Sequence, residues 1–122
     1  MSTEPPTPAA FSPFAAELHA TADEAVLRIC GEIDLATEDA MSDAIDALLE
    51  SGAQDVVIDL RDVAYMDSTG VQRLLSAQFR AEEAGQDLRL RLSGPAWRIL
   101  LLCGVLPRLT VLDEPGTPQD GS

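Results

Sequence analysis

The sequence predicts a single α/β domain with a mixed, mostly parallel β-sheet and helices, in the order β-β-α-β-α-β-α-β. Three observations support this prediction. The chain has 122 residues, which suits one domain and leaves no room for a second core. Two short apolar segments joined by a polar turn open the domain, and strand-like and helix-like segments then alternate up to residue 112. Such alternation is typical of parallel strands joined by right-handed crossover helices.

Two terminal segments fall outside this domain. Residues 1–13 contain four prolines, and residues 113–122 contain two prolines and two glycines with no apolar residue. Proline-rich polar segments cannot hold a regular element or bury an apolar face. We therefore expect flexible tails at 1–13 and 113–122 around a domain spanning residues 14–112.

The composition indicates an acidic globular protein. Hydrophobic residues make up 46% of the chain, and 21 acidic against 8 basic residues give a formal net charge of −13. Such a chain repels phosphate backbones and anionic lipid, so neither nucleic acid nor a membrane is an expected partner. No apolar run approaches the roughly 20 residues that span a bilayer. Because the first residues lack a secretory signal, we expect a cytoplasmic protein.

Cysteine and histidine are scarce. Cys30 and Cys103 are too few for a disulfide framework, and we expect both to be reduced, small apolar residues of the core. His19 is expected to be an ordinary strand residue. Because no cluster has metal-ligand spacing, the sequence predicts neither a metal site nor a cofactor.

The first elements are two strands at residues 14–20 and 25–30, and the polar turn at 21–24 favours an antiparallel pair. A helix follows at about residues 38–51, with Thr37 as the expected N-cap and Gly52 as its end. The apolar residues on one face of this helix are Met41, Ile45, Leu48 and Leu49.

Residues 55–60 form a nearly continuous apolar run, which is typical of a strand buried on both faces. A second helix is expected at about residues 69–84, and Gly85 ends it. The side chains predicted to face the core from this helix are Val71, Leu74, Leu75 and Phe79.

Leucines alternate with arginines over residues 88–92, which predicts a strand with one solvated face. A third helix opens at residues 93–95 and ends at Gly104, and a last strand covers residues 109–112. The third helix is expected to direct Trp97, Leu100 and Leu101 inward.

The segment that follows the strand at 55–60 carries the polar groups of greatest interest. In open α/β sheets, reactive groups gather where strands end and helices begin. Asp67 or Ser68 could serve only as the N-cap of the second helix. Alternatively, the Ser68 hydroxyl accepts a phosphoryl group, because a phosphate at a helix N-terminus meets N–H donors and the positive end of the dipole. Gly70 has no Cβ, so backbone or a partner could approach it closely.

Three segments resemble the STAS-domain anti-sigma factor antagonists. Residues 31–37 (Gly-Glu-Ile-Asp-Leu-Ala-Thr) resemble the family's G-E-L-D-L-A-T segment. Residues 67–71 (Asp-Ser-Thr-Gly-Val) resemble its D-S-S/T-G-L/V phosphorylation motif at matching spacing, and residues 103–105 resemble its L-x-G-L/V segment. The resemblance covers about residues 14–112, so it implies a single STAS domain.

The resemblance also implies a switch and no enzymatic activity of the chain itself. In this family a serine kinase that is also the anti-sigma factor binds the antagonist and transfers the γ-phosphoryl group of ATP to a serine, here Ser68. Thr69 is the fallback acceptor. The unphosphorylated antagonist holds the anti-sigma factor and frees the sigma factor, whereas the phosphorylated antagonist is released until a phosphatase resets it.

The same resemblance places a partner-binding surface on the loop at residues 31–34 and on the second helix. Asp34 matches an acidic position of the family near the acceptor, although it is an equally good N-cap for the first helix. Asp67 is expected to orient the loop or the acceptor hydroxyl. The residues expected around the phosphorylation site and in partner binding are Asp34, Asp67, Thr69, Gly70, Gln72 and Arg73. A solvated helix face explains Gln72 and Arg73 equally well.

Three other functions compete with this switch. A phospho-aspartate receiver would use Asp59, near the end of a buried strand, but it also needs an acidic pair for Mg²⁺ and a lysine, and the chain has no lysine. A hydrolase with Ser68 as nucleophile needs a base, and His19 is the only histidine. The remaining alternative is a STAS scaffold or sensor subunit, of the stressosome or lipid-transport type, without control by phosphorylation.

Overall fold

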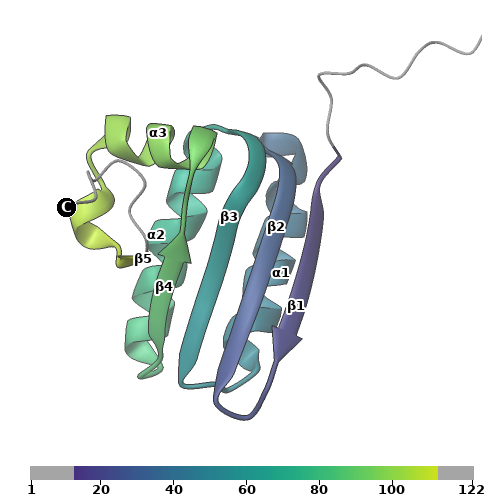
Figure 1. The fold of residues 1–122 in the computed structure, drawn as a ribbon, viewed down its shortest axis with the longest axis vertical. Helices are drawn as coiled ribbons and strands as arrows, with labels where there is room; N and C mark the ends of the chain where they lie inside the picture. Colours follow the sequence, from purple (N-terminus) through teal and green to yellow (C-terminus); the bar gives the residue numbers. More distant parts are fainter. Residues whose placement is uncertain (1–12, 113–122) are drawn as a thin grey trace, which may run out of the picture.

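A computed structural model describes residues 13–112 of the chain, and within them one five-stranded sheet is flanked by helices (Figure 1). The strand order is β1-β2-β3-β4-β5; β1 and β2 are antiparallel, and the other pairs are parallel. The predicted α/β class, the mixed sheet and the order of elements are confirmed. The predicted tails at 1–13 and 113–122 lie outside the described residues, apart from Pro13.

The strands are β1 (Ala15–Ala20), β2 (Glu24–Ile33), β3 (Asp55–Met66), β4 (Asp87–Arg91) and β5 (Val111–Leu112). The helices of the described region are η1 (Leu35–Thr37), α1 (Glu38–Glu50), α2 (Ser68–Glu83), α3 (Gly94–Cys103) and η2 (Leu106–Arg108), where η marks a short 3₁₀ helix.

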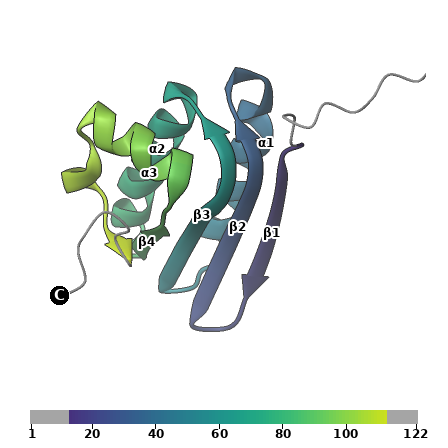
Figure 2. The same ribbon diagram turned by 45° about the horizontal axis from the view of Figure 1, so that its top comes forward.

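The core lies between the sheet and two helices. Helices α1 and α2 lie side by side on one face of the sheet, and α3 lies across the end at which β3 and β4 finish (Figures 1 and 2). Alternate residues of β2, namely Ala25, Leu27 and Ile29, are buried against the helices. The opposite face of β2 and β3 carries the polar residues Arg28, Asp59, Arg61 and Asp62, and in the described part of the chain α3 contacts β3.

Strand β3 is longer than the sequence pattern predicts. We expected a strand at 55–60 followed by a loop, but β3 continues to Met66. Its pairing with β2 shifts register twice, once after Arg28 and once after Gly31. At each shift β3 carries an extra residue, so two consecutive side chains point away from the core. This irregularity hid the strand, because period-two alternation is lost beyond residue 60.

Two side chains predicted to face the core do not. Phe79 of α2 is 63% exposed and Leu101 of α3 is 54% exposed. The buried face of α2 instead contains Ala77 and Ala81, and these small residues bring the helix close to the sheet while Phe79 lies outside the contact. Helix α3 lies at the sheet's end, where it buries only Ala96 and Leu100.

The expectation that both cysteines are core residues is wrong. Cys30 is half-buried on the open face of β2, because Leu27 and Ile29 occupy the alternate positions that face the helices. Cys103 is exposed at the last position of α3, and neither forms a disulfide. His19 is an exposed residue of β1, as predicted.

Residues 13–112 contain neither a candidate membrane span nor a candidate metal site. No helix in this part of the chain is long and apolar enough to cross a membrane. No group of three histidine, cysteine, aspartate or glutamate side chains within it lies close enough together to hold a metal ion.

Candidate functional site

The two segments that carry the family motifs meet at one edge of the sheet. Ile33 ends β2 and pairs with Met66, which ends β3. The Asp67 backbone N–H donates a hydrogen bond to the Ile33 carbonyl oxygen at 3.2 Å. We call residues 34–38 and 67–70, which follow these paired ends, the motif edge. It lies where β2 and β3 lead into α1 and α2 (Figure 1).

Asp67 is the N-cap of α2. Its Oδ1 accepts a hydrogen bond from the Thr69 backbone N–H at 2.8 Å, and its carbonyl oxygen accepts one from the Gly70 N–H at 3.1 Å. An aspartate in this position satisfies N–H groups that the helix itself leaves unpaired. The capping role that the sequence left open between Asp67 and Ser68 therefore belongs to Asp67.

Ser68 is the first residue of α2, and its side chain is exposed. Because Asp67 caps the helix, the Ser68 hydroxyl is not needed for that purpose. Thr69, the fallback acceptor, is half-buried, and its backbone N–H is the group that Asp67 binds. Of the two hydroxyls, Ser68 is the more open to an approaching partner.

Asp34 caps the short helix that precedes α1. Its Oδ1 accepts a hydrogen bond from the Thr37 N–H at 3.2 Å, and the Asp34 N–H donates to Thr37 Oγ1 at 3.0 Å. These reciprocal bonds form a capping box on η1. Thr37, the expected N-cap of α1, makes no capping bond with its side chain there. The half-buried Asp34 carboxylate thus shapes the loop beside Asp67.

Gly70 is buried, and the groups that approach it closely in the structure belong to the chain itself. A Cβ added at this position would lie 2.5 Å from Met66 Cγ and 2.9 Å from Ile33 Cγ2. The missing side chain therefore lets α2 sit directly on the ends of β2 and β3. Gly70 thereby determines how closely the first turn of α2 packs on the sheet, and this packing determines the position of Ser68.

Gln72 and Arg73 have different surroundings in the structure. Gln72 is exposed one turn after Ser68, where a partner can reach it. Arg73 is half-buried and faces α1, with its Nε 3.8 Å from Glu38 Oε2. Arg73 therefore joins the first turns of the two helices rather than standing on the outer surface.

The sequence reasoning missed exposed apolar side chains around the motif edge. Leu35 is 75% exposed, although it belongs to the motif at 31–37, and Leu102 is 76% exposed. A shallow groove of about 190 Å³ lies between the end of β3 and α3. Its lining residues are Tyr65, Met66, Pro95, Arg98, Ile99 and Leu102. Leu35 could have been identified from its place in the motif, but nothing in the Leu100–Leu102 run marks which leucine is exposed.

The family model described as "Mlab, STAS domain" matches residues 16–105. The chain belongs to the STAS-domain family. No curated protein matches the sequence.

Solved structures with the same fold include several antagonists. This STAS domain is similar to an anti-sigma factor antagonist from Mycobacterium paratuberculosis, with 24% identity, a TM-score of 0.74, and 83% of this chain and 86% of that one covered. It is also similar to the antagonist SpoIIAA in its unphosphorylated form, with 20% identity, a TM-score of 0.66, and 82% and 90% covered. Bacillus SpoIIAA in its phosphorylated form matches with 22% identity, a TM-score of 0.61, and 82% and 93% covered. At these identities the likeness establishes the fold.

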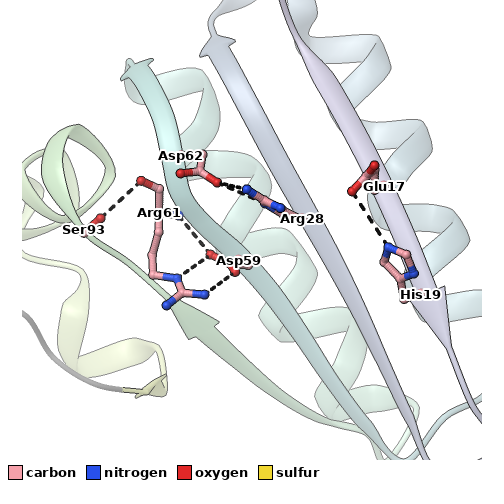
Figure 3. Close-up of polar contacts among 7 residues, drawn as sticks. All are labelled: Glu17, His19, Arg28, Asp59, Arg61, Asp62 and Ser93. Carbon is pink, nitrogen blue, oxygen red and sulfur yellow. Dashed lines mark hydrogen bonds and ion pairs between the residues drawn. The ribbon is translucent and has the colours of Figure 1, made fainter.

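The open face of the STAS domain carries a second polar group, away from the motif edge (Figure 3). Arg61 Nε and Nη2 donate to Asp59 Oδ1 and Oδ2 at 3.0 and 2.9 Å, and Arg28 pairs with Asp62. Asp59 lies well inside β3 rather than at its end, so the geometric premise of a receiver-like acceptor is wrong. Both carboxylate oxygens of Asp59 already accept hydrogen bonds from Arg61.

The pKa of Asp59 has two opposing influences. Burial raises it, but hydrogen bonds from the Arg61 side chain and backbone, with the charges of Arg61 and Arg91, leave it below its ordinary value. Because the folded state lowers this pKa, the stability gained from ionised Asp59 is present above the ordinary aspartate range, near 3.9, and is lost as pH falls through the folded value.

We predict that Asp59→Asn lowers the free energy of unfolding by about 2 kcal/mol at neutral pH, because it removes the charged acceptor of Arg61. The deficit should shrink as pH falls below about 4. Urea unfolding followed by circular dichroism over a pH series measures the difference in unfolding free energy from the wild type. Asp43→Asn, at an exposed position of α1, is the control. A deficit that stays constant down to pH 2 would contradict the prediction.

Proposed function

We propose that this STAS domain is an anti-sigma factor antagonist whose binding to an anti-sigma factor is switched off by phosphorylation of Ser68. The observation that carries the proposal is the position of Ser68: an exposed hydroxyl at the first residue of α2, beside a capping aspartate that leaves it unengaged in the cap. A phosphate there meets the positive end of the helix dipole, so the fold tolerates the product. The solved antagonists of the same fold, one of them in a phosphorylated form, support this reading.

The expected partner is a serine kinase that binds ATP and also acts as the anti-sigma factor, with a separate phosphatase that restores the hydroxyl. The chain itself acts as a cytoplasmic regulator rather than an enzyme. The exposed Leu35 belongs to the motif edge, and the groove between β3 and α3 is lined in part by Met66, two residues before Ser68. Exposed apolar groups rimmed by polar residues are typical of docking surfaces.

The charges at the motif edge indicate the charge expected on the partner's binding surface. Asp34, Asp67 and Glu38 lie there, and Arg73 is paired with Glu38. A basic surface on the partner would therefore complement this edge and speed the encounter of the two proteins. Gln72 adds an exposed amide next to the acceptor.

Phosphate labelling tests the proposal directly. The purified chain, incubated with radiolabelled ATP and extract of the native cells, is expected to take up one phosphate, which peptide mass spectrometry locates on Ser68. Ser68→Ala should abolish the label, whereas Thr69→Ala should keep it. No uptake by the wild-type chain, or equal uptake by Ser68→Ala, would refute the assignment.

The matching family model is described by the name Mlab rather than as an antagonist, which favours a second candidate. In that case the domain is a STAS scaffold or sensor subunit, and phosphorylation does not control it. Binding of the partner by Ser68→Asp separates the two candidates: an antagonist loses the partner, and a scaffold keeps it.

A further inference from the structure

The N-terminal edge of the sheet is long and uncovered in the described part of the chain. Strand β1 has one neighbour, β2, and all six of its residues are exposed. The opposite edge is formed by β5, which has two residues and offers little backbone for pairing. A six-residue open edge is a template for another strand unless something blocks it.

The pairing pattern shows which backbone groups of β1 face outward. The Thr21 N–H donates to the Glu24 carbonyl oxygen at the turn, so Thr21 and Glu24 form a hydrogen-bonded pair. In an antiparallel ladder such pairs alternate with pairs that are not hydrogen-bonded. Counting back along the register, the backbone groups that point to the free edge are those of Ala16, Leu18 and Ala20.

The side chains of this edge are self-complementary. Residues 16–20 read Ala-Glu-Leu-His-Ala, which is symmetric about Leu18 except that glutamate and histidine mirror each other. A second β1 strand, placed antiparallel with a two-fold axis at Leu18, sets Leu18 opposite Leu18 and Ala16 opposite Ala20. The same register sets Glu17 opposite His19 on both sides of the axis. Within one chain these two side chains already lie on one face, 3.8 Å apart (Figure 3).

Helix α1 leaves room for such an approach. Its flank toward α2 carries Glu38 and Asp46, which pair with Arg73 and Arg80. Its opposite flank, on the β1 side, carries the small residues Ala40, Ala44 and Ala47, of which Ala40 and Ala47 are exposed. Leu18 lies beside the buried Leu27, on the same side of the sheet as α1, and is 39% exposed. These alanines put no bulky side chain on this flank, and the charged residue nearest to them on the helix surface is the exposed Asp43.

We infer that this face is a homodimer interface, in which β1 of two copies pairs antiparallel about Leu18 to form one continuous sheet. The self-complementary order of residues 16–20 selects a second copy of this chain over an unrelated strand. The motif edge, where β2 and β3 end, stays open in each copy, so the inference does not depend on the proposed function.

Sedimentation velocity over a concentration series tests the inference. The wild-type chain should move from 13.0 kDa toward twice that mass as its concentration rises. Each copy carries a charge of −13, so about 0.1 M salt is used, where the screening length is about 10 Å. His19→Glu, which sets carboxylates opposite each other twice per dimer, should weaken association about tenfold.

A charge swap provides the matched control. Glu17→His combined with His19→Glu keeps the composition and again sets one carboxylate opposite one imidazole at each position across the axis, so it should dimerise like the wild type. Leu18→Pro removes an outward N–H that the β1–β2 ladder does not use, so it should give a folded monomer. A wild-type chain that stays monomeric throughout, or a swap that associates no better than His19→Glu, overturns the inference.

Amide exchange followed by NMR gives an independent measurement. The amides of Ala16, Leu18 and Ala20 should become protected as concentration rises, while those of Glu17 and His19 should be protected already in the monomer. Protection of all five amides that is independent of concentration would contradict pairing through this edge.

Discussion

Ser68→Asp is expected to weaken binding of the partner kinase about 100-fold, which corresponds to about 2.7 kcal/mol. The acceptor hydroxyl must approach the γ-phosphate of ATP in the kinase, so a carboxylate at this position meets the phosphates of the bound nucleotide and is repelled. The loss should be larger with ATP present than without nucleotide. Titration calorimetry against the kinase identified by phosphate labelling measures both values.

Two controls separate charge from size and from overall electrostatics. Ser68→Asn has nearly the shape of the aspartate variant without its charge. It should bind the partner at least tenfold more tightly than that variant, which corresponds to about 1.4 kcal/mol of binding free energy. Ala22→Asp adds the same charge in the exposed turn between β1 and β2, at the other end of the sheet, and it should bind like the wild type. If Ser68→Asp retains the partner, the phosphorylation switch is refuted and the scaffold candidate is favoured.

The order of elements was predictable because most of them obey simple periodicity. Helix α1 keeps its buried residues Met41, Ile45 and Leu48 at helical spacing, and β4 alternates leucine with arginine. The pattern failed where the backbone departs from a regular ladder. Between Arg61 and Met66 the two register shifts of β3 put neighbouring residues on one side, and no periodic template recognises such a strand.

The site was predictable in part, from its motifs. The acidic and hydroxyl residues that follow β2 and β3 lie at one edge because these two parallel strands are neighbours, which the structure shows. Their individual roles were not predictable, because Asp67 and Ser68 are both good N-cap residues and only the geometry distinguishes them. The sequence also did not predict that the Arg73 side chain faces α1, because its contact there is with Glu38, which lies far away in sequence.

Gly70→Val is expected to lower the free energy of unfolding by about 3 kcal/mol, because branched carbons at this buried position overlap Met66 and Ile33. Ile33 is fully buried and Met66 is 4% exposed, so neither side chain has open solvent to move into. Gly70→Ala should lose less, since alanine recovers about 1 kcal/mol of helix propensity over glycine. Urea unfolding followed by circular dichroism ranks the three proteins.

The clash itself is tested by a double-mutant cycle with Met66→Ala, which removes the Cγ and Sδ atoms that lie 2.5 and 2.6 Å from the added Cβ. If overlap causes the loss, Gly70→Ala should cost less in the Met66→Ala background than alone, by about 1 kcal/mol. Gln72→Val, at an exposed position of the same helix, should lose only the propensity difference of about 0.5 kcal/mol. An equal loss for Gly70→Val and Gln72→Val would mean that α2 does not rest on the strand ends at Gly70. In that case the packing of Gly70 on the strand ends would not determine the position of Ser68.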